Sequence, residues 1–424
     1  MARDNGDGGG EFLATPKAPP NLNIPTSSST VSVSVIDTGV RVSLPIAPFL
    51  EPQIRGKGRM TGPAYSFLIT HNQSGRRLLF DLSVRKDCRT GFAPAVQQRV
   101  NDPAKEFWVR WIDPLSSSSS SPKWEADTEP ETEPRDVVDV LAAGGLRPDD
   151  IEAVVWSHHH WDHTGDVTRF PAASTKLVVG PGFTQAFGAG WPAVEGAPVK
   201  GEEWAGRELV EVGFNEEDGL KIGRFRAMDW WGDGSFYLLD TPGHAVGHLC
   251  GLARVRAGQG GGDEAFVFMG GDCAHHGAEF RPSPYLPLPR TIAPSPFPRH
   301  PQHATICPGA LFAPIHPASS LPEKATKPFY TPTQFFPYNF DDCVWSIDGL
   351  QEFDADERVF VVNAHDESLL SVFYGAGGEG KGKGWIWPEG TLDSWREGQN
   401  LATRARWAFL EDFAEAAGLG EGEK

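Results

Sequence analysis

Short apolar runs recur along the chain from residue 31 to residue 362, and most have the length of a β-strand. Residues 31–35 alternate apolar and polar positions, which predicts a half-buried strand. Residues 137–141 predict a short helix that ends at the glycines after it, and helical spacing of the apolar positions in 403–417 predicts a helix packed on the core. Further strands are predicted at 65–69, 78–80, 151–156, 176–179, 236–239, 266–269 and 358–362.

Three segments differ in composition from this pattern. Residues 1–29 are rich in Gly, Pro, Ser and Asn and poor in apolar residues, so we expect a flexible N-terminal tail. Residues 115–135 contain a serine run and an acidic stretch, typical of a low-complexity loop. Residues 277–345 form a long insertion rich in Pro and aromatic residues, and such segments are often lids or binding loops. No linker divides the remainder, so residues 30–424 are expected to form a single domain.

Composition and charge indicate a large globular protein and argue against nucleic acid and anionic membranes as binding partners. The chain has 424 residues, 39% of them hydrophobic, which is ample for a large core. Its formal net charge of -18 opposes binding to nucleic acid or to an anionic membrane, because both attract clustered Lys and Arg. The N-terminal residues lack the apolar core of a signal peptide, and no stretch has the length of a membrane-spanning helix, so we expect a cytoplasmic protein. The five cysteines are scattered without a C-x-x-C pair, so no thiolate zinc site is indicated.

The strongest chemical signal is the sequence H-H-H-W-D-H at residues 158–163, directly after the predicted strand at 151–156. In an extended segment His158 and His160 point to the same side, and Asp162 continues that face. His163 can turn back toward them because residues 164–166 allow a sharp bend, whereas His159 alternates away and is expected to pack or to contact the surface. These side chains are enough to begin two metal sites, but other segments must complete them.

Three later residues can supply the missing ligands. His244, Asp272 and His365 each follow a predicted strand, in the sequences T-P-G-H, G-G-D and N-A-H. The combined set holds five histidines and two aspartates, and this mixture of nitrogen and oxygen donors suits Zn²⁺ better than Mg²⁺ or Ca²⁺. The ordered set H-x-H-x-D-H, T-P-G-H, G-D and a strand-end histidine resembles the metallo-β-lactamase superfamily, in its lactonase-like branch, over residues 31–370 or so.

This resemblance implies an α/β (α+β) fold, the four-layered αββα sandwich, with two zinc ions at one edge of the sheets. Asp81, in the sequence F-D-L, resembles an aspartate that the family carries after an early strand, and it is expected either to orient a ligand or the metal-bearing loop or to be an ordinary strand-end carboxylate. Asp272 or His275 is expected to protonate the leaving group. The ligand sets that the resemblance implies are His158, His160 and His244 for one ion and Asp162, His163 and His365 for the other, with Asp272 bridging both.

Several nearby residues are assigned by position. His275 stands three residues after Asp272, where lactonases of the superfamily often carry a tyrosine that contacts the substrate, and we expect it to donate a proton. His248 is either a residue that supports a ligand or an ordinary hydrogen-bonded histidine. Trp161 and Tyr285 are expected to line the substrate pocket, and the insertion indicates a small apolar or aromatic substrate.

The predicted reaction is hydrolysis. Two zinc ions that share a water lower its pKa toward about 7, which supplies hydroxide at neutral pH. The first hypothesis is that this nucleophile opens a small cyclic ester or cyclic amide, in detoxification or secondary metabolism. The alternative is a thioesterase of the same superfamily that acts on acyl-carrier, coenzyme A or glutathione thioesters.

Overall fold

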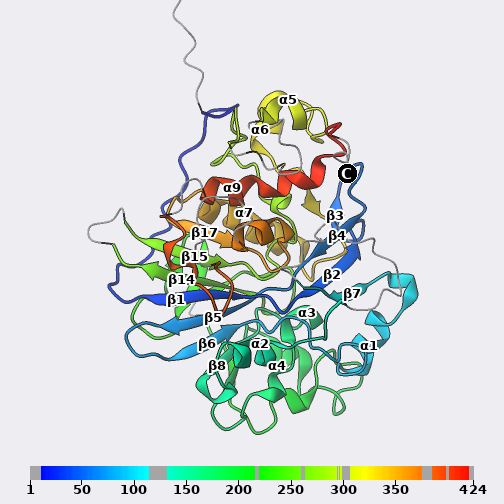
Figure 1. The fold of residues 1–424 in the computed structure, drawn as a ribbon, viewed down its shortest axis with the longest axis vertical. Coiled ribbons are helices and arrows are strands. Elements are labelled where there is room, and N and C mark those ends of the chain that lie inside the picture. Colours follow the sequence, from blue (N-terminus) through cyan, green and yellow to red (C-terminus); the bar gives the residue numbers. More distant parts are fainter. Residues whose placement is uncertain are drawn as a thin grey trace, which may run out of the picture.

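Two β-sheets of six strands each lie face to face, and helices cover the outer face of each sheet (Figure 1). The computed structural model describes residues 11–113, 131–214, 219–258, 263–293, 295, 297, 306–374, 384–397 and 401–419. The first sheet has the order β1 (Val31–Ile36), β5 (Ser66–His71), β6 (Arg77–Phe80), β8 (Ala153–Val155), β9 (Lys176–Val179) and β10 (Leu209–Glu211). The second has the order β11 (Lys221–Ile222), β12 (Phe225–Asp229), β13 (Phe236–Asp240), β14 (Leu249–Arg256), β15 (Ala265–Met269) and β17 (Val359–Val362).

The space between the two sheets is filled by the apolar positions that the sequence pattern picks out. Val31, Val33 and Val35 of β1 are fully buried and belong to one cluster with Phe236 and Leu238 of β13. Because successive side chains of a strand point to opposite faces, the alternating positions of β1 all reach this inner layer. The alternation therefore placed β1 correctly, although its other face is covered as well.

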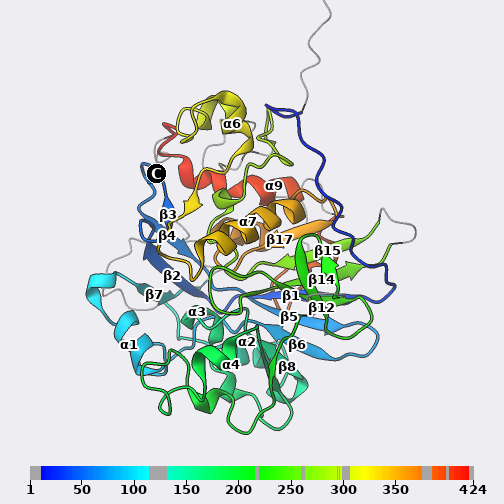
Figure 2. The same cartoon turned by 180° about the vertical axis from the view of Figure 1, so that it is seen from behind.

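Helices close the sandwich on both sides. Leu141 of α2 packs with Leu79 and Val154 on the outer face of the first sheet, and Leu350 of α7 packs with Phe268 on the outer face of the second. Figure 2 shows the same layers from behind, with α2 and α4 on one side and α7 and α9 on the other. The architecture is the predicted αββα sandwich. The helices concerned are α2 (Val137–Ala143), α4 (Phe183–Phe187), α7 (Phe340–Asp354) and α9 (Leu401–Trp407).

A smaller layer adjoins the sandwich at the edge where the predicted ligands lie. It contains a three-stranded sheet of order β4-β2-β7 and a two-stranded pair of β16 with β3. The insertion at 277–345 is not structureless, since it forms the short helices α5 (Pro308–Phe312) and α6 (Leu321–Thr326) and the first part of α7. The remaining elements of this layer are α1 (Pro94–Val100), β2 (Val40–Pro45), β3 (Leu50–Glu51), β4 (Arg59–Gly62), β7 (Trp108–Trp111) and β16 (Thr331–Pro332).

The N-terminal segment differs from the flexible tail that its composition predicts. Within the described part, Leu22 is fully buried in the cluster between α7 and the second sheet, and its carbonyl oxygen accepts a 2.6 Å hydrogen bond from the backbone of Gly223. The backbone nitrogen of Leu13 donates to the carbonyl oxygen of Leu288 at 2.9 Å. One buried leucine and pairing to a distant segment hold residues 11–29 in place, and composition carries no information on such contacts.

Two further expectations compare with the structure as follows. The predicted helix at 403–417 is observed as α9 followed by the 3₁₀ segment Ala408–Phe413, and its apolar positions Phe409, Leu410 and Phe413 are buried as expected. Most of the low-complexity loop, residues 114–130, lies outside the described residues. Among the helices that are described, none is long and apolar enough to cross a membrane.

Candidate metal centre

Five strands end at the same edge of the sandwich, and each is followed by a residue of the predicted centre. β6 leads to Asp81, β8 to the cluster at 158–163, β13 to His244, β15 to Asp272 and β17 to His365. β6 and β8 run parallel, as do β15 and β17, so their carboxyl ends meet. All seven predicted ligands converge there and form two groups. In each group, every side chain offers one nitrogen or oxygen atom, and these atoms lie no more than 4.8 Å from one another.

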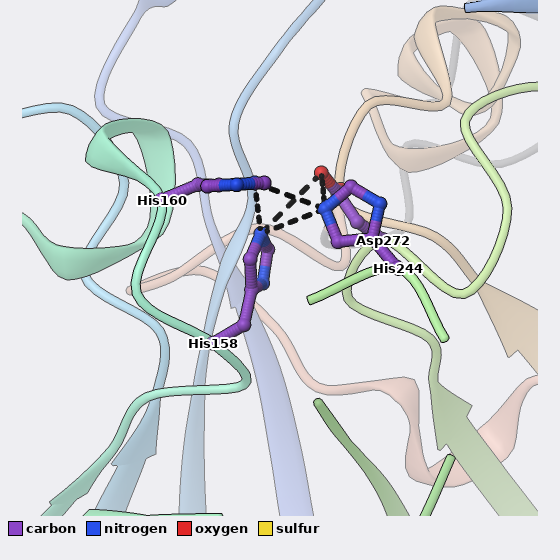
Figure 3. A group of neighbouring side chains, drawn as sticks. All are labelled: His158, His160, His244 and Asp272. Atoms are coloured by element: carbon purple, nitrogen blue, oxygen red, sulfur yellow. Dashed lines mark hydrogen bonds and ion pairs between the residues drawn. The ribbon is translucent and has the colours of Figure 1, made fainter. Parts of the chain in front are cut away.

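The first group joins His158, His160, His244 and Asp272 (Figure 3). His160 Nδ1 lies 2.9 Å from both His158 Nε2 and His244 Nε2, and the latter two atoms are 3.1 Å apart. Asp272 Oδ2 lies 3.4 Å from His244 Nε2 and 3.6 Å from His158 Nε2. Three ring nitrogens and one carboxylate oxygen thus face a common point.

This arrangement fits a cation better than it fits hydrogen bonding. In a hydrogen bond between two imidazole nitrogens, one must carry a proton and the other must not. Three nitrogens that all lie within hydrogen-bond distance of one another therefore cannot all be hydrogen-bonded to each other. Burial, followed by the neighbouring imidazoles, lowers the pKa of His158 and His160 well below its usual value, which favours the neutral form that binds metals. A metal ion that accepts all three lone pairs satisfies the three nitrogens together.

The second group joins Asp162, His163 and His365. His365 Nε2 lies 3.5 Å from Asp162 Oδ2, and Asp272 Oδ1 lies 3.2 Å from both His163 Nε2 and His365 Nε2. His163 Nε2 and Asp272 Oδ1 are buried and have no hydrogen-bond partner in the described structure. Asp272 therefore directs one carboxylate oxygen to each group, and two buried atoms are left that a cation could satisfy.

Asp81 occupies the position behind the second group that the sequence predicts. Its Oδ2 lies 2.8 Å from His163 Nδ1, and its Oδ1 accepts the backbone N–H of Ser157 at 2.7 Å. The carboxylate fixes the tautomer of His163 by holding a proton on Nδ1, so the lone pair of Nε2 points to the centre. Burial alone would lower the pKa of His163, but Asp272 and Asp81 raise it well above its usual value.

His248 and His365 are held by comparable contacts. His248 Nε2 accepts the backbone N–H of Asp272 at 3.0 Å, and its Nδ1 lies 3.1 Å from the carbonyl oxygen of Thr241. His248 therefore supports the loop that carries Asp272 and is not itself in either group of ligands. His365 Nδ1 donates to the carbonyl oxygen of Pro63 at 2.7 Å, which turns its Nε2 toward Asp272.

His159 and His275 lie on different sides of the ligands. His159 packs against Phe187 with ring centroids 4.5 Å apart, so it takes the packing role expected of it. His275 Nε2 lies 3.5 Å from Asp272 Oδ2 and has no hydrogen-bond partner in the described structure. Burial alone would lower the pKa of His275, but Asp272 and then Glu279 raise it. His275 thus borders the centre with a free ring nitrogen.

A pocket of about 870 Å³, including its opening to solvent, leads to the centre. Of the two residues expected to contact the substrate, Trp161 lines this pocket and Tyr285 does not. The segment around Tyr285 pairs with the N-terminal segment, where the backbone nitrogen of Lys17 donates to the carbonyl oxygen of Pro284 at 2.8 Å. The insertion supplies Phe336 instead, whose ring lies 4.2 Å from that of Phe49 and 5.3 Å from that of His275.

Several pocket residues were not identified from the sequence. Most come from the three-stranded sheet and the turns beside its strands, from α1 and from the 3₁₀ segment Ala408–Phe413, and no local pattern marks them. His276 and Glu367 lie close in the chain to Asp272 and His365, but neither belongs to a ligand motif. The apolar ones contribute to the wall around the centre, and the charged ones are separate from the ligand groups. These residues are Val42, Leu44, Met60, Phe107, Lys57, Arg99, His276, Glu367, Phe409 and Asp412.

Comparison with known proteins agrees with this geometry. A family model described as the metallo-beta-lactamase superfamily matches residues 112–254, which include the cluster at 158–163 and His244. The Gamma-lactamase FDB1 of Fusarium pseudograminearum is 38% identical over 411 residues, which are 95% of this chain and 87% of that protein. The chain belongs to the metallo-β-lactamase superfamily.

Two further relatives of the superfamily extend this result. The Metallo-hydrolase mfmC of Annulohypoxylon moriforme is 39% identical over 404 residues, which are 95% of this chain and 92% of that protein. The Gamma-lactamase MBL2 of Gibberella moniliformis is 48% identical over 198 residues, which are 47% of this chain and 78% of that protein. With its fold, family and clustered histidines, this member of the metallo-β-lactamase superfamily is a metal-dependent hydrolase.

Proposed function

We propose that the protein is a two-zinc hydrolase that opens a small cyclic amide or cyclic ester, with a five-membered ring as its preferred substrate. The observation that carries the proposal is the position of Asp272, which directs one oxygen to each of two groups of ligands. The ring size is taken from the relatives, two of which bear the name gamma-lactamase. A γ-lactam is a five-membered cyclic amide.

The two groups of side chains have the composition of a two-metal site. His158, His160 and His244 would hold one ion, and Asp162, His163 and His365 the other, with Asp272 shared between them. When bound, such ions polarise a carbonyl group and lower the pKa of a water to about 7. Nitrogen and oxygen donors without any thiolate are compatible with Zn²⁺, and a shell shared by two ions leaves positions open for substrate.

The chain's own residues supply orientation and a proton. Asp81 holds His163, and His248 holds the backbone of Asp272, so the two groups are fixed before substrate arrives. Opening a cyclic amide leaves an amine nitrogen that must be protonated. His275 has a ring nitrogen without a partner, 3.5 Å from the shared carboxylate, and its Nε2–H would donate that proton.

A thioesterase is the weaker alternative for the same site. A thiol has a pKa of about 8.5, so a thiolate leaves readily without a proton donor such as His275. An amine leaves poorly unless it is protonated, and the placement of His275 therefore favours an amide or ester over a thioester.

The experiment combines metal analysis with a pair of adjacent variants. The purified protein should contain about two transition-metal ions per chain and should hydrolyse γ-lactams or γ-lactones. His160→Ala should lower kcat/KM by at least about 100-fold, because the first group loses one of its three nitrogens. His159→Ala is the matched control, since this neighbour packs on Phe187 and lies outside both groups.

Two results would contradict the proposal. One is full hydrolytic activity in protein that holds one ion or none. The other is an equal loss of activity in both variants, which would assign the effect to folding of the segment at 158–163 and not to metal binding.

A further inference from the structure

The pocket contains a second polar cluster beside the metal-binding residues. It consists of Lys57 in the turn between β3 and β4, His276, Glu367 in the 3₁₀ segment Glu367–Leu369, and Asp412 in the 3₁₀ segment that follows α9. These four residues come from four separate parts of the chain, and all of them line the same pocket as His160 and Asp272. None of them belongs to either group of metal-binding side chains.

Three members of the cluster are linked into a fixed array. Lys57 Nζ lies 2.8 Å from Asp412 Oδ1, and Asp412 Oδ2 lies 2.8 Å from His276 Nε2. His276 Nδ1 accepts the backbone N–H of Ala278 at 3.0 Å, so its proton is on Nε2 and is donated to Asp412. Both oxygens of Asp412 are thereby engaged, and the array cannot rotate freely.

Lys57 keeps hydrogen-bonding capacity toward the pocket. An ammonium group has three donors, and among the described residues Asp412 is its one ion-pair partner. The side chain is only 13% exposed, which is unusual for a lysine, because most lysines keep their charge in water. A buried ammonium with donors to spare, next to open space in a pocket, can bind an oxygen of a ligand.

Glu367 is the complementary group. Its side chain is exposed and lines the pocket, and within the described structure it makes no hydrogen bond or ion pair. The 3₁₀ segment Glu367–Leu369 packs against the 3₁₀ segment that carries Asp412, the partner of Lys57, and no ion pair joins Glu367 to Lys57 in the described structure. A hydrogen-bond donor and an acceptor therefore line the same part of the pocket without an ion pair between them. The ion pair between Lys57 and Asp412 can serve to stabilise the fold. Glu367 has no such contact, so a structural role does not account for its position in the pocket.

We propose that Lys57 and Glu367 together bind a hydroxyl group on the part of the substrate that is not hydrolysed. The ammonium donates to the hydroxyl oxygen, and the hydroxyl hydrogen is donated to the carboxylate. Apolar neighbours in the same wall, Met60 and Phe409, would contact the carbon skeleton that carries the hydroxyl. The inference rests on the proposed function, because it names a feature of the ring substrate that the site would open.

The test uses two γ-lactams with the same alkyl side chain, one ending in a methyl group and the other in a hydroxymethyl group. The holoenzyme should favour the hydroxylated compound by about tenfold in kcat/KM, the size expected for a hydrogen bond to a charged group. In Glu367→Leu this preference should fall toward one, whereas Glu367→Gln, which keeps an acceptor, should retain part of it. Binding of both compounds, measured by calorimetry, should show the same ratio.

The matched control is Glu195→Leu. Glu195 is also exposed and lacks a hydrogen bond or ion pair in the described structure, but it lies outside this pocket. The control should leave the substrate preference unchanged. The inference is overturned if the holoenzyme treats both compounds alike in binding, or if Glu367→Leu keeps the full preference. If neither compound is hydrolysed but the binding ratio is present and is lost in Glu367→Leu, the subsite stands and the proposed function fails.

Discussion

At the scale of single residues, the ligand positions are distinguished by which atom each side chain directs to the centre. His158 and His244 present Nε2, whereas His160 presents Nδ1. The spacing of two residues puts His158 and His160 on one side of the segment, but it does not determine which ring nitrogen points inward. A contact behind the ring makes that choice for His163, whose Nδ1 is engaged by Asp81, and for His158, whose Nδ1 lies 3.0 Å from Ser157 Oγ.

Asp81→Asn tests this role. Asparagine loses the negative charge that holds the proton on His163 Nδ1, so we expect affinity for the ion at the Asp162, His163 and His365 group to fall by about 10–100-fold. Zinc titration of metal-free protein against a competing chelator measures both affinities. The first group should change less, because Asp81 contacts none of its side chains directly. Asp149→Asn is the control: this aspartate is exposed and belongs to neither group of ligands, so the change should alter neither affinity. Unchanged metal binding in Asp81→Asn would contradict the assignment.

At the scale of elements, the loops that follow the strands need particular residues in order to position the ligands that they carry. Gly243 precedes His244 and has φ of +123°, and a Cβ atom there would lie 2.0 Å from the backbone nitrogen of Cys343 in α7. The carbonyl oxygens of Gly243 and His244 also accept hydrogen bonds from Asn339 and Tyr338. The glycine of the T-P-G-H motif therefore allows α7 to approach the loop that positions His244.

Gly243→Ala should displace either α7 or the His244 loop. Overpacking costs about 1–3 kcal/mol, and a non-glycine residue at this φ adds about 1–3 kcal/mol, so we expect a clearly lower urea midpoint together with weaker metal binding. Gly213→Ala is the control, because a Cβ there meets no atom within 4 Å and φ is ordinary. A Gly243→Ala protein with unchanged midpoint and metal content would refute the packing argument.

At the scale of the whole molecule, segments that are far apart in sequence complete the sandwich. Residues 11–29 cross the second sheet and bring Leu22 under α7, and the insertion at 277–345 packs with the 3₁₀ segment 408–413 at the edge of the pocket. The N-terminal segment thus contributes to the same outer layer as α7, which carries the residues that contact the His244 loop.

Leu22→Ala measures that contribution. A fully buried leucine replaced by alanine costs about 2–5 kcal/mol, so the free energy of unfolding should fall by that amount in urea titrations. Leu321→Ala removes the same atoms from a side chain that is 55% exposed and should cost less than about 0.5 kcal/mol. Equal stability of the two variants would show that residues 11–29 do not anchor the fold.

The sequence by itself determined the features that are local in the chain. Alternation and short apolar runs predicted β1, β5, β6, β8, β9, β13, β15 and β17, but not β10, β11, β12 or β14. The spacing within 158–163 together with three strand-end motifs identified all seven residues that converge. The expectation that these residues meet came from the order of the motifs and the family resemblance that they carry. In the structure, the parallel pairs β6 with β8 and β15 with β17 bring their carboxyl ends to one edge.

Only the tertiary structure decided the rest. It buried Leu22 in a segment of loop-like composition, placed Tyr285 outside the pocket and Phe336 inside it, and brought Lys57 close to Asp412. Such contacts depend on packing between segments hundreds of residues apart, and no period or motif encodes them. For this reason the sequence specifies the metal chemistry, whereas the shape of the pocket, and with it the substrate, is set by how the outer layers pack on the sandwich.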